Sequence, residues 1–310
     1  MIAMVVRRLG WALVTLWLVV SGSFALAYLL PADPARMVAG PHASPETIAR
    51  IRVELGLDKP LPVQYARYLG GVVTGDLGKS YRTERPVLQM VGDAIPRTAL
   101  LAVGAGVVQV GLGVPIGLLA ALRRRTAIDT GAMALALVGI SAPTFLVGLA
   151  LMVVLGYHAR LFHIGGLGEG LGVLRHAVLP SLTLGIAGAA YYSRLTRGEY
   201  LDVAQRDFMR TARVKGLPER VVVIRHGLRN ALLPVVTYLG LDMGALLGGA
   251  IVTETLFAWP GVGRLAVESV LNQDIPVMLG TVLVASVAVV AANLVVDLVY
   301  LVLDPRIRAG

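Results

Sequence analysis

The sequence predicts an all-α integral membrane protein with six transmembrane helices. Hydrophobic residues make up 56% of the 310 residues and charged residues only 15%, and the mean hydropathy is +0.74. Soluble domains usually contain about a quarter charged residues, so this composition favours a chain that crosses a membrane several times. A helix needs about 20 apolar residues to cross a bilayer. Five uncharged runs and a sixth that contains one acid meet or approach this length: 9–30, 98–122, 130–157, 177–193, 275–296 and, with Asp242, 230–253.

The first run also has features of a secretory signal peptide. Arg7 and Arg8 precede it, and Ala25-Leu26-Ala27 resembles a cleavage site. The apolar core of a signal peptide has about 7 to 15 residues, whereas this run continues to Leu30. We therefore expect it to be kept as the first transmembrane helix.

The basic residues predict the orientation, because Lys and Arg are enriched in the cytoplasmic loops of membrane proteins. If both ends face the cytoplasm, 16 basic residues lie inside and three lie in the short outer loops. The long outer segment, 31–96, is nearly balanced, with eight basic and seven acidic residues. We therefore expect an N-in, C-in protein, and the net charge of +9 needs no nucleic acid to explain it. The inner residues are Arg7, Arg8, Arg123 to Arg125, nine between Arg194 and Arg229, Arg306 and Arg308, and the outer ones are Arg160, Arg175 and Arg264.

The outer segment has helical signals of its own. Ser44-Pro45-Glu46 combines an N-cap residue with proline at the first helical position, and Gly56 follows as a terminator. Two more short helices are expected, at 62–73 and 86–94. Together these helices would form a small extracytoplasmic cap.

Stripes of small residues run along two of the spans. Gly113 and Gly117 lie four residues apart in the second span, and Gly240, Gly244 and Gly248 repeat this interval in the fifth. In a bilayer such stripes let helix backbones approach closely. They predict close packing, either within this chain or against a second one.

Three polar residues inside the apolar runs are candidates for a translocation path: Asp242, Asn293 and Asp297. Ionisable groups are costly within a membrane and by default mark a pathway or a buried partner. Asn293 precedes Asp297 by one helical turn on the same face. Asp297 lies near Asp304 and the cytoplasmic end of its span. A structural hydrogen bond is therefore an equal alternative to a role in transport for Asp297.

The search for catalytic chemistry finds no constellation. Cysteine is absent, which excludes disulfides and thiolate chemistry. The stretch "GDLGKSY", 75–81, resembles a phosphate-binding loop, but Val73 stands where that pattern needs glycine. Ser141 has no histidine within a span to activate it, and with Pro143 it is expected to shape a helix kink. The five histidines show no recognised metal spacing.

The most basic segment is "RDFMRTARVKGLPERVVVIRHGLRN", 206–230, with seven Arg or Lys and two acids. Over 203–215 the apolar residues Ala204, Phe208 and Ala212 recur every four positions, with arginines on another side. This period predicts a short amphipathic helix. From the residues alone, such a helix either lies on anionic headgroups or docks on a partner.

Gly216 and Pro218 end this helix, and a second one then leads into the fifth span. Its apolar stripe is predicted to consist of Leu217, Val221, Ile224 and Leu228. The sequence therefore predicts a helix, a glycine turn and a second helix at the cytoplasmic face.

The run "RTARVKGLPERVVVIRHGLRNALLP" resembles the cytoplasmic loop, often called the EAA loop, of inner-membrane permease subunits of binding-protein-dependent ABC importers, in their dipeptide and oligopeptide branch. Arg210-Thr211-Ala212 stands in the place of Glu-Ala-Ala, Gly216 follows four residues after Ala212, and Leu233-Pro234 comes later than in the general pattern. Other stretches are also similar to this branch: "LLPADPA", which has Ala32 where glycine is usual, "LGLDKPLPVQYARYL", "GDLGKSYRTERPV", "ETLFAWPGVGRLAVESVLNQDIP" and "NLVVDLVYLVLDPRIR". Asp242 matches no position of the pattern.

The resemblance implies the type I ABC importer transmembrane fold. Residues 1–96 would hold the first span and the extracytoplasmic segment, and 97–310 the permease domain with a cytoplasmic coupling loop, 198–230. Helix 203–215 would be a coupling helix seated in a groove of an ATPase subunit. The residues implied in this contact are Arg206, Phe208, Arg210, Thr211, Ala212, Arg213, Lys215 and Gly216.

The resemblance also implies the partners, which are a homologous second permease, two cytoplasmic ATPase subunits and an extracytoplasmic solute-binding protein. The segment 31–96 and the loop around Trp259, Pro260 and Gly261 would meet the binding protein. ATP and Mg²⁺ would bind to the ATPase subunits, so this chain is expected to bind no cofactor or metal and not to be an enzyme. It would lie in a bacterial inner membrane and translocate di- or oligopeptides.

Alternatives stay open at this point. Related permeases resemble one another while serving nickel or glutathione. A proton-coupled secondary transporter would use Asp242 and Asp297 and would work as a single chain. An intramembrane enzyme acting through Ser141 is the third class.

Overall fold

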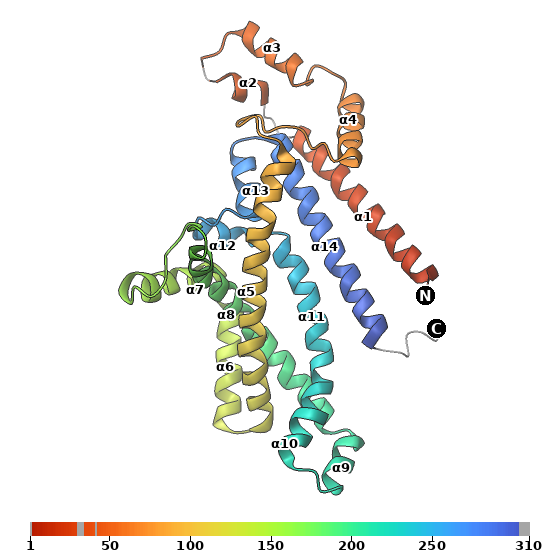
Figure 1. Ribbon diagram of the computed structural model, residues 1–310, viewed down its shortest axis with the longest axis vertical. Helices are drawn as coiled ribbons and strands as arrows, with labels where there is room; N and C mark the ends of the chain where they lie inside the picture. The colour runs from red at the N-terminus through yellow and green to blue at the C-terminus, as the bar shows by residue number, and fades with distance from the viewer. Residues whose placement is uncertain (1, 30–33, 41, 304–310) are drawn as a thin grey trace. The chain divides into compact units, whose positions relative to one another are not determined.

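The computed structural model describes residues 2–29, 34–40 and 42–303 (Figure 1). In chain order its helices are α1 (Ile2–Leu29), α2 (Pro34–Ala39), α3 (Pro45–Glu54), α4 (Leu61–Thr74), α5 (Val87–Leu122), α6 (Ala127–Ser141), α7 (Thr144–Leu151), η1 (Met152–His158), α8 (Gly172–Ala204), α9 (Asp207–Val214), α10 (Glu219–Val221), η2 (Val222–Leu228), α11 (Arg229–Leu247), α12 (Ile251–Leu256), α13 (Val262–Leu271) and α14 (Ile275–Leu303). The elements η1 and η2 are π-helical.

The chain divides into two compact units, which do not follow chain order. Unit 1 consists of Met1–Thr98, Leu247–Ile251 and Pro260–Ala291, and unit 2 consists of Ala99–Leu246, Val252–Trp259 and Ala292–Gly310.

Five helical stretches of the described residues are long and apolar enough to cross a membrane: Arg7–Ala27, Val87–Leu122, Gly172–Ala204, Glu219–Leu247 and Ile275–Val295. A sixth span is formed if the pair Ala127–Ser141 and Thr144–His158 is taken together. The predicted all-α architecture is confirmed, and its six spans are reached with the bent pair as the third.

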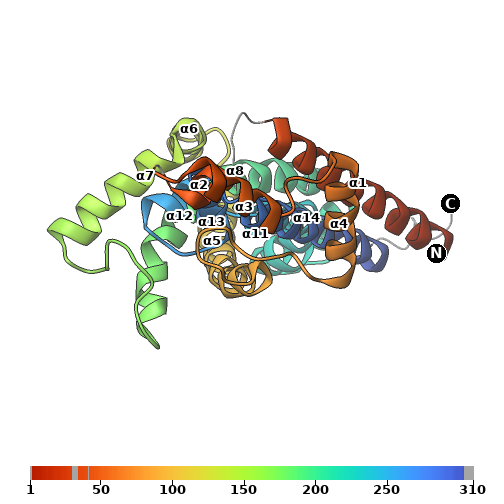
Figure 2. The same cartoon turned by 90° about the horizontal axis from the view of Figure 1, so that it is seen from above.

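The third span is broken rather than kinked. Its two halves, α6 and α7, meet at 103°, and Figure 2 shows α6 end-on with α7 lying lengthwise. Pro143 disfavours helical backbone at the residue before it, and Ala142 is extended, with φ −73° and ψ 126°. The expected kink at Ser141 and Pro143 is therefore located correctly, but the chain turns a corner there.

The outer helices of unit 1 form largely as predicted. Ser44 Oγ accepts a hydrogen bond from Thr47 N and caps α3, and α4 closely matches the predicted helix at 62–73. The predicted separate helix at 86–94 is wrong, because these residues begin α5, which continues through Pro96. With 36 residues α5 is about 54 Å long, well beyond the ~30 Å apolar core of a bilayer. Because its uncharged run begins only at residue 98, the N-terminal turns are the part expected to extend past the membrane.

The stretch that resembles a phosphate loop has a structural role in unit 1. Ser80 Oγ donates a hydrogen bond to Asp274 Oδ2 at 2.5 Å, and Tyr81 N donates to Oδ1 at 3.1 Å. The same hydroxyl accepts from Arg82 N and Thr83 N at 3.2 and 3.0 Å. Both Ser80 and Asp274 are buried, so this residue pair fastens the loop to the start of α14.

Replacing Asp274 with alanine is expected to release residues 75–86. The buried hydroxyl of Ser80 would lose its acceptor, and an unsatisfied buried polar group costs about 1 to 3 kcal/mol. Hydrogen exchange of the purified protein should show faster exchange at residues 75–86. Glu268→Ala is the matched control, because it removes an exposed pair with Arg264 worth about 0 to 1 kcal/mol. Equal protection in both variants would show that Asp274 does not hold the loop.

In unit 2, α5 and α8 approach each other closely at glycines of both helices. A Cβ atom added at Gly113 would lie 2.5 Å from Tyr192 Cβ, and one added at Gly117 would lie 2.3 Å from the Ser193 carbonyl oxygen. On the α8 side, a Cβ at Gly185 would meet Val108 at 2.4 Å. The prediction of close helix approach is confirmed for Gly113 and Gly117, and their neighbour is α8 of the same chain.

Candidate functional site

The predicted coupling loop folds as two helical segments joined by a tight glycine turn, as Figure 1 shows for α9 and α10 beside the ends of α8 and α11. Helix α9 begins at Asp207, with Arg206 as its N-cap residue, and ends at Val214. Gly216 has a φ of +74°, a left-handed conformation that only glycine adopts at little cost. The glycine turn is thus confirmed, whereas the helix predicted at 203–215 is shorter, because Val203 and Ala204 belong to α8.

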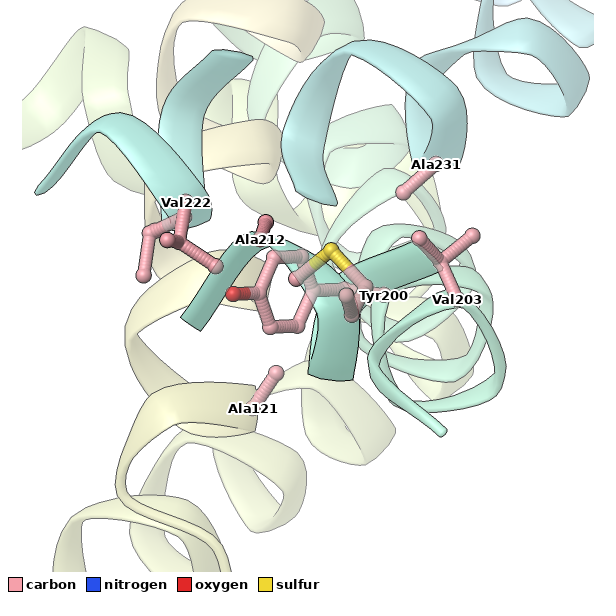
Figure 3. Close-up of a cluster of buried hydrophobic side chains, with 8 residues drawn as sticks. Ala121, Tyr200, Val203, Ala212, Val222 and Ala231 are labelled. Carbon is pink, nitrogen blue, oxygen red and sulfur yellow. The ribbon is translucent and has the colours of Figure 1, made fainter. Parts of the chain in front are cut away.

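One face of α9 is buried in unit 2. Met209 and Ala212 belong to a core cluster with Ala121, Tyr200, Val203, Val222, Val223 and Ala231. Figure 3 shows the ring of Tyr200 in the middle of this cluster, with Ala212 and Val222 nearby. Met209 is completely buried. The prediction that Ala204 and Ala212 belong to a partner-facing apolar side is therefore wrong, since both pack within this chain.

The apolar stripe predicted for the second helix consists of other residues in the structure. In η2 the backbone hydrogen bonds reach five residues back rather than four, so successive turns rotate the side chains away from α-helical spacing. The structure buries Val222, Val223 and Gly227. Leu217 and Ile224, predicted to lie on the buried stripe, are exposed.

The opposite face of α9 is exposed to solvent. It carries Arg210, Thr211 and Val214, of which Val214 is 82% exposed, and Phe208 at its side is 38% exposed. Lys215 and Arg206 are exposed at the two ends. This face combines apolar and basic side chains in a helix that is held from behind, an arrangement suited to a groove with acidic edges.

Arg213 has a partner within the loop. Its Nη2 and Nε atoms donate to Glu219 at 3.0 and 3.3 Å, and this hydrogen bonding raises the pKa of the Arg213 guanidinium above its ordinary value. The pair ties the end of α9 to the start of α10 across Gly216. We therefore assign Arg213 to bracing the turn, while Arg210 has no ion pair among the described residues.

A buried ion pair fixes α8 close to this loop. Arg197 Nε and Nη2 donate to the two carboxylate oxygens of Asp129 at 2.6 and 2.8 Å, and Arg125 N donates to Oδ2 at 3.0 Å. The side chain of Asp129 is 7% exposed. It joins the start of α6 to the last turns of α8. No sequence pattern predicted this pair, the burial of Met209 or the contact made by Glu219.

The predicted path residues lie in different surroundings. Asp242 is half-buried in α11 and accepts a hydrogen bond from the Tyr192 hydroxyl at 3.4 Å. Asn293 is exposed on α14. Asp297 lies in the same helix, but its side chain is outside the described residues.

The loop predicted to face a binding protein is mostly buried. Trp259 is completely buried against Leu101 and Ala177, and Gly261 is buried as the N-cap residue of α13. The expectation that Trp259 faces a partner is corrected to a packing role, because its ring fills the core of unit 2. Pro260 is half-buried, and its contact with a binding protein stays a prediction.

Comparison with known proteins finds matches along nearly the whole chain. The family described as "Binding-protein-dependent transport system inner membrane component" matches residues 113–309, and its N-terminal counterpart matches residues 1–102. The glutathione transport system permease protein of Salmonella paratyphi A is 44% identical over 308 residues, covering 99% of both chains. That of Pectobacterium atrosepticum is 44% identical over 303 residues, covering 98% of both. A putative peptide transport system permease protein of Brucella abortus is 41% identical over 312 residues, covering 99% of both. The chain thus belongs to the family of binding-protein-dependent transport system inner membrane components, as a multi-pass permease subunit of an ABC importer.

Proposed function

We propose that this chain is one transmembrane half of an ATP-driven importer of short peptides, glutathione included. It would pair with a homologous permease and two cytoplasmic ATPase subunits, and a solute-binding protein would deliver the substrate. ATP and Mg²⁺ would bind to the ATPase subunits, and this chain would contribute translocation. The names of the relatives support the substrate class, since they are glutathione and peptide transport system permease proteins.

The observation that carries the proposal is the two-sided build of α9. Met209 and Ala212 anchor one side in the core of unit 2, and the other side presents Val214 and Arg210 to solvent. Val214 and Phe208 are both exposed on this helix, next to basic side chains, and apolar surface rimmed by polar residues marks protein interaction sites. A partner that grips this face would move α8 with it.

In the proposed mechanism, closure of the ATPase subunits on ATP pulls α9 and drives a rocking of the permease halves from inward-open to outward-open. A ligand shifts such an equilibrium only by binding one state better than the other. ATP and the loaded binding protein would therefore both favour the outward-open state. The effect of ATP would be transmitted from the ATPase subunits to this chain at the exposed face of α9.

Among the alternatives, the family match favours the ATP-driven importer over a proton-coupled transporter that acts as one chain. The relatives favour short peptides over nickel, because their names give glutathione and peptides as cargo. Asn293 and Asp297 remain candidates for the lining of the path.

Cells that lack this chain are expected to lose uptake of radiolabelled glutathione or of a radiolabelled dipeptide, and the chain in a plasmid is expected to restore it. Because hydrolysis of ATP drives the transport, depleting ATP while the proton gradient is maintained should stop uptake. Nickel uptake, measured in parallel, should not change. Transport by the purified chain alone, driven by a proton gradient, would instead support the secondary transporter.

A further inference from the structure

Asp242 is an acidic residue within one of the spans. It lies in α11, within the apolar stretch Glu219–Leu247, and it has no ion pair among the residues that the structure describes. A charged group within a membrane is costly unless it meets a partner or a watery cavity. Asp242 is half-buried, so part of the residue lies at the surface of this chain.

A cluster of three tyrosines lies beside this carboxylate. Tyr192 is completely buried and donates its hydroxyl to Asp242 Oδ2 at 3.4 Å. The ring of Tyr238 lies 5.5 Å from that of Tyr192 and stacks on that of Tyr191 at 4.3 Å. Tyr191 is 40% exposed. The rings thus form a continuous aromatic wall from the buried carboxylate partner to the surface.

A second acceptor is available at the same place. Gln109 of α5 is 3% exposed, and its side chain lies beside the Asp242 carboxylate. Its Oε1 atom is buried without a hydrogen-bond partner among the described residues. Gly188 makes room for this side chain, because a Cβ atom there would lie 2.3 Å from Gln109 Nε2. Buried polar atoms are nearly always paired in folded proteins, so an unused acceptor beside an uncompensated carboxylate marks a position for an N–H donor.

We propose that Asp242, Gln109 and the tyrosine wall form a binding site for the amino-terminal ammonium group of the transported peptide. An ammonium offers three N–H donors, which suit the carboxylate and the free amide oxygen, and its charge is attracted to the faces of aromatic rings. Short peptides and glutathione share this group, whatever their side chains. The inference rests on the proposed function and adds where this subunit contacts the substrate.

The geometry also explains why the acid is tolerated. The hydrogen bond from the Tyr192 hydroxyl and the neighbouring side chain of Gln109 hold the carboxylate in place before a substrate arrives. Pre-positioned acceptors lose little entropy when the ligand binds. The site would therefore recognise one end of the peptide and leave the remainder free to vary.

The test compares a free peptide with its N-acetylated form in proteoliposomes that contain the complete transporter and its binding protein. Asp242→Asn removes the charge and keeps a group that can hydrogen-bond Tyr192. Uptake of the free peptide is expected to fall about tenfold or more, as expected for loss of a hydrogen bond to a charged group. Uptake of the acetylated peptide, corrected for its separately measured affinity for the binding protein, should stay unchanged. Thr237→Val, on the same helix, is the matched control and should transport both peptides normally.

A second pair of variants tests the aromatic wall without touching the acid. Tyr238→Leu removes the ring face and is expected to lower uptake of the free peptide about two- to fivefold, in line with one cation–π contact. Tyr238→Phe keeps the ring and should retain uptake.

Three outcomes would overturn the inference. Unchanged uptake by Asp242→Asn would show that the carboxylate does not meet the substrate. If uptake of both peptides falls equally and the second permease no longer co-purifies, Asp242 instead forms an ion pair with a basic residue of that subunit. If the unaltered transporter moves another solute but no peptide, the proposed function itself fails, and the inference fails with it. This result is distinguishable from the first two, because they appear only in the variants.

Discussion

Replacing Val214 with aspartate is expected to lower uptake by about tenfold or more while the amount of the subunit in the membrane stays unchanged. Val214 is 82% exposed, and changes at such positions usually alter folding stability by no more than about 0.5 kcal/mol. In a complex, the same change would place a charge in the groove that the α9 face fills, where removing one central contact commonly costs about 2 kcal/mol or more. Uptake and co-purification of the ATPase subunits measure the two consequences. Arg210→Glu, on the same face, should act in the same direction.

Leu171→Asp is the matched control for this prediction. Leu171 is 85% exposed and is the N-cap residue of α8, in a loop predicted to lie on the extracytoplasmic side. Its replacement introduces the same charge at similar exposure and should leave uptake and ATPase co-purification normal. If Val214→Asp and Arg210→Glu both behave like the control, the exposed face of α9 does not contact the ATPase subunits.

Arg197→Ala is expected to produce the largest loss of stability, about 3 to 5 kcal/mol. The substitution leaves the carboxylate of Asp129, whose side chain is 7% exposed, buried without its counter-charge, and breaking a buried pair on one side costs about this much. The start of α6 would no longer be tied to α8. Thermal unfolding of the detergent-solubilised subunit, followed by tryptophan fluorescence, is the measurement.

The double variant Asp129→Ala with Arg197→Ala separates loss of the ion pair from loss of packing. Because no unpaired charge remains, it is expected to be more stable than Arg197→Ala alone. With Asp129→Ala measured as well, the effect of the double variant minus the sum of the two single effects gives the coupling energy of the pair. If the double variant is destabilised by the sum of the two single changes, Asp129 and Arg197 do not act as a pair.

The membrane-spanning helices could be predicted well because a spanning backbone must satisfy its own hydrogen bonds. This requirement leaves long apolar runs in the sequence, such as 98–122 and 275–296, and both lie within spanning helices of the structure. The break at Pro143 was located for a local reason, the restricted backbone of Ala142. Its angle of 103° depends on neighbouring segments and has no local signature.

The coupling loop shows where a single sequence stops being informative. Its helix and turn follow from spacing and from Gly216, but the orientation of α9 does not. In a helix of eight residues, Phe208 with Ala212 and Met209 with Ala212 are equally good apolar pairs. The break before Asp207 decides between these pairs, because it sets the rotation of α9 about its own axis and thus which side chains face Tyr200. The partner of Arg197 lies 68 residues away, and no local pattern connects the two.

The contact between α5 and α8 limits how this permease can move. At Gly113 and Gly117 the α5 backbone lies so close to main-chain atoms of α8 that an added Cβ atom would clash with them, and at Gly185 the α8 backbone lies against the β-branched side chain of Val108, which has few rotamers. The two helices therefore cannot slide past each other or exchange register without a clash of their main chains. They would travel as a single stiff beam, and the pivots of the transport cycle must lie at joints outside this pair.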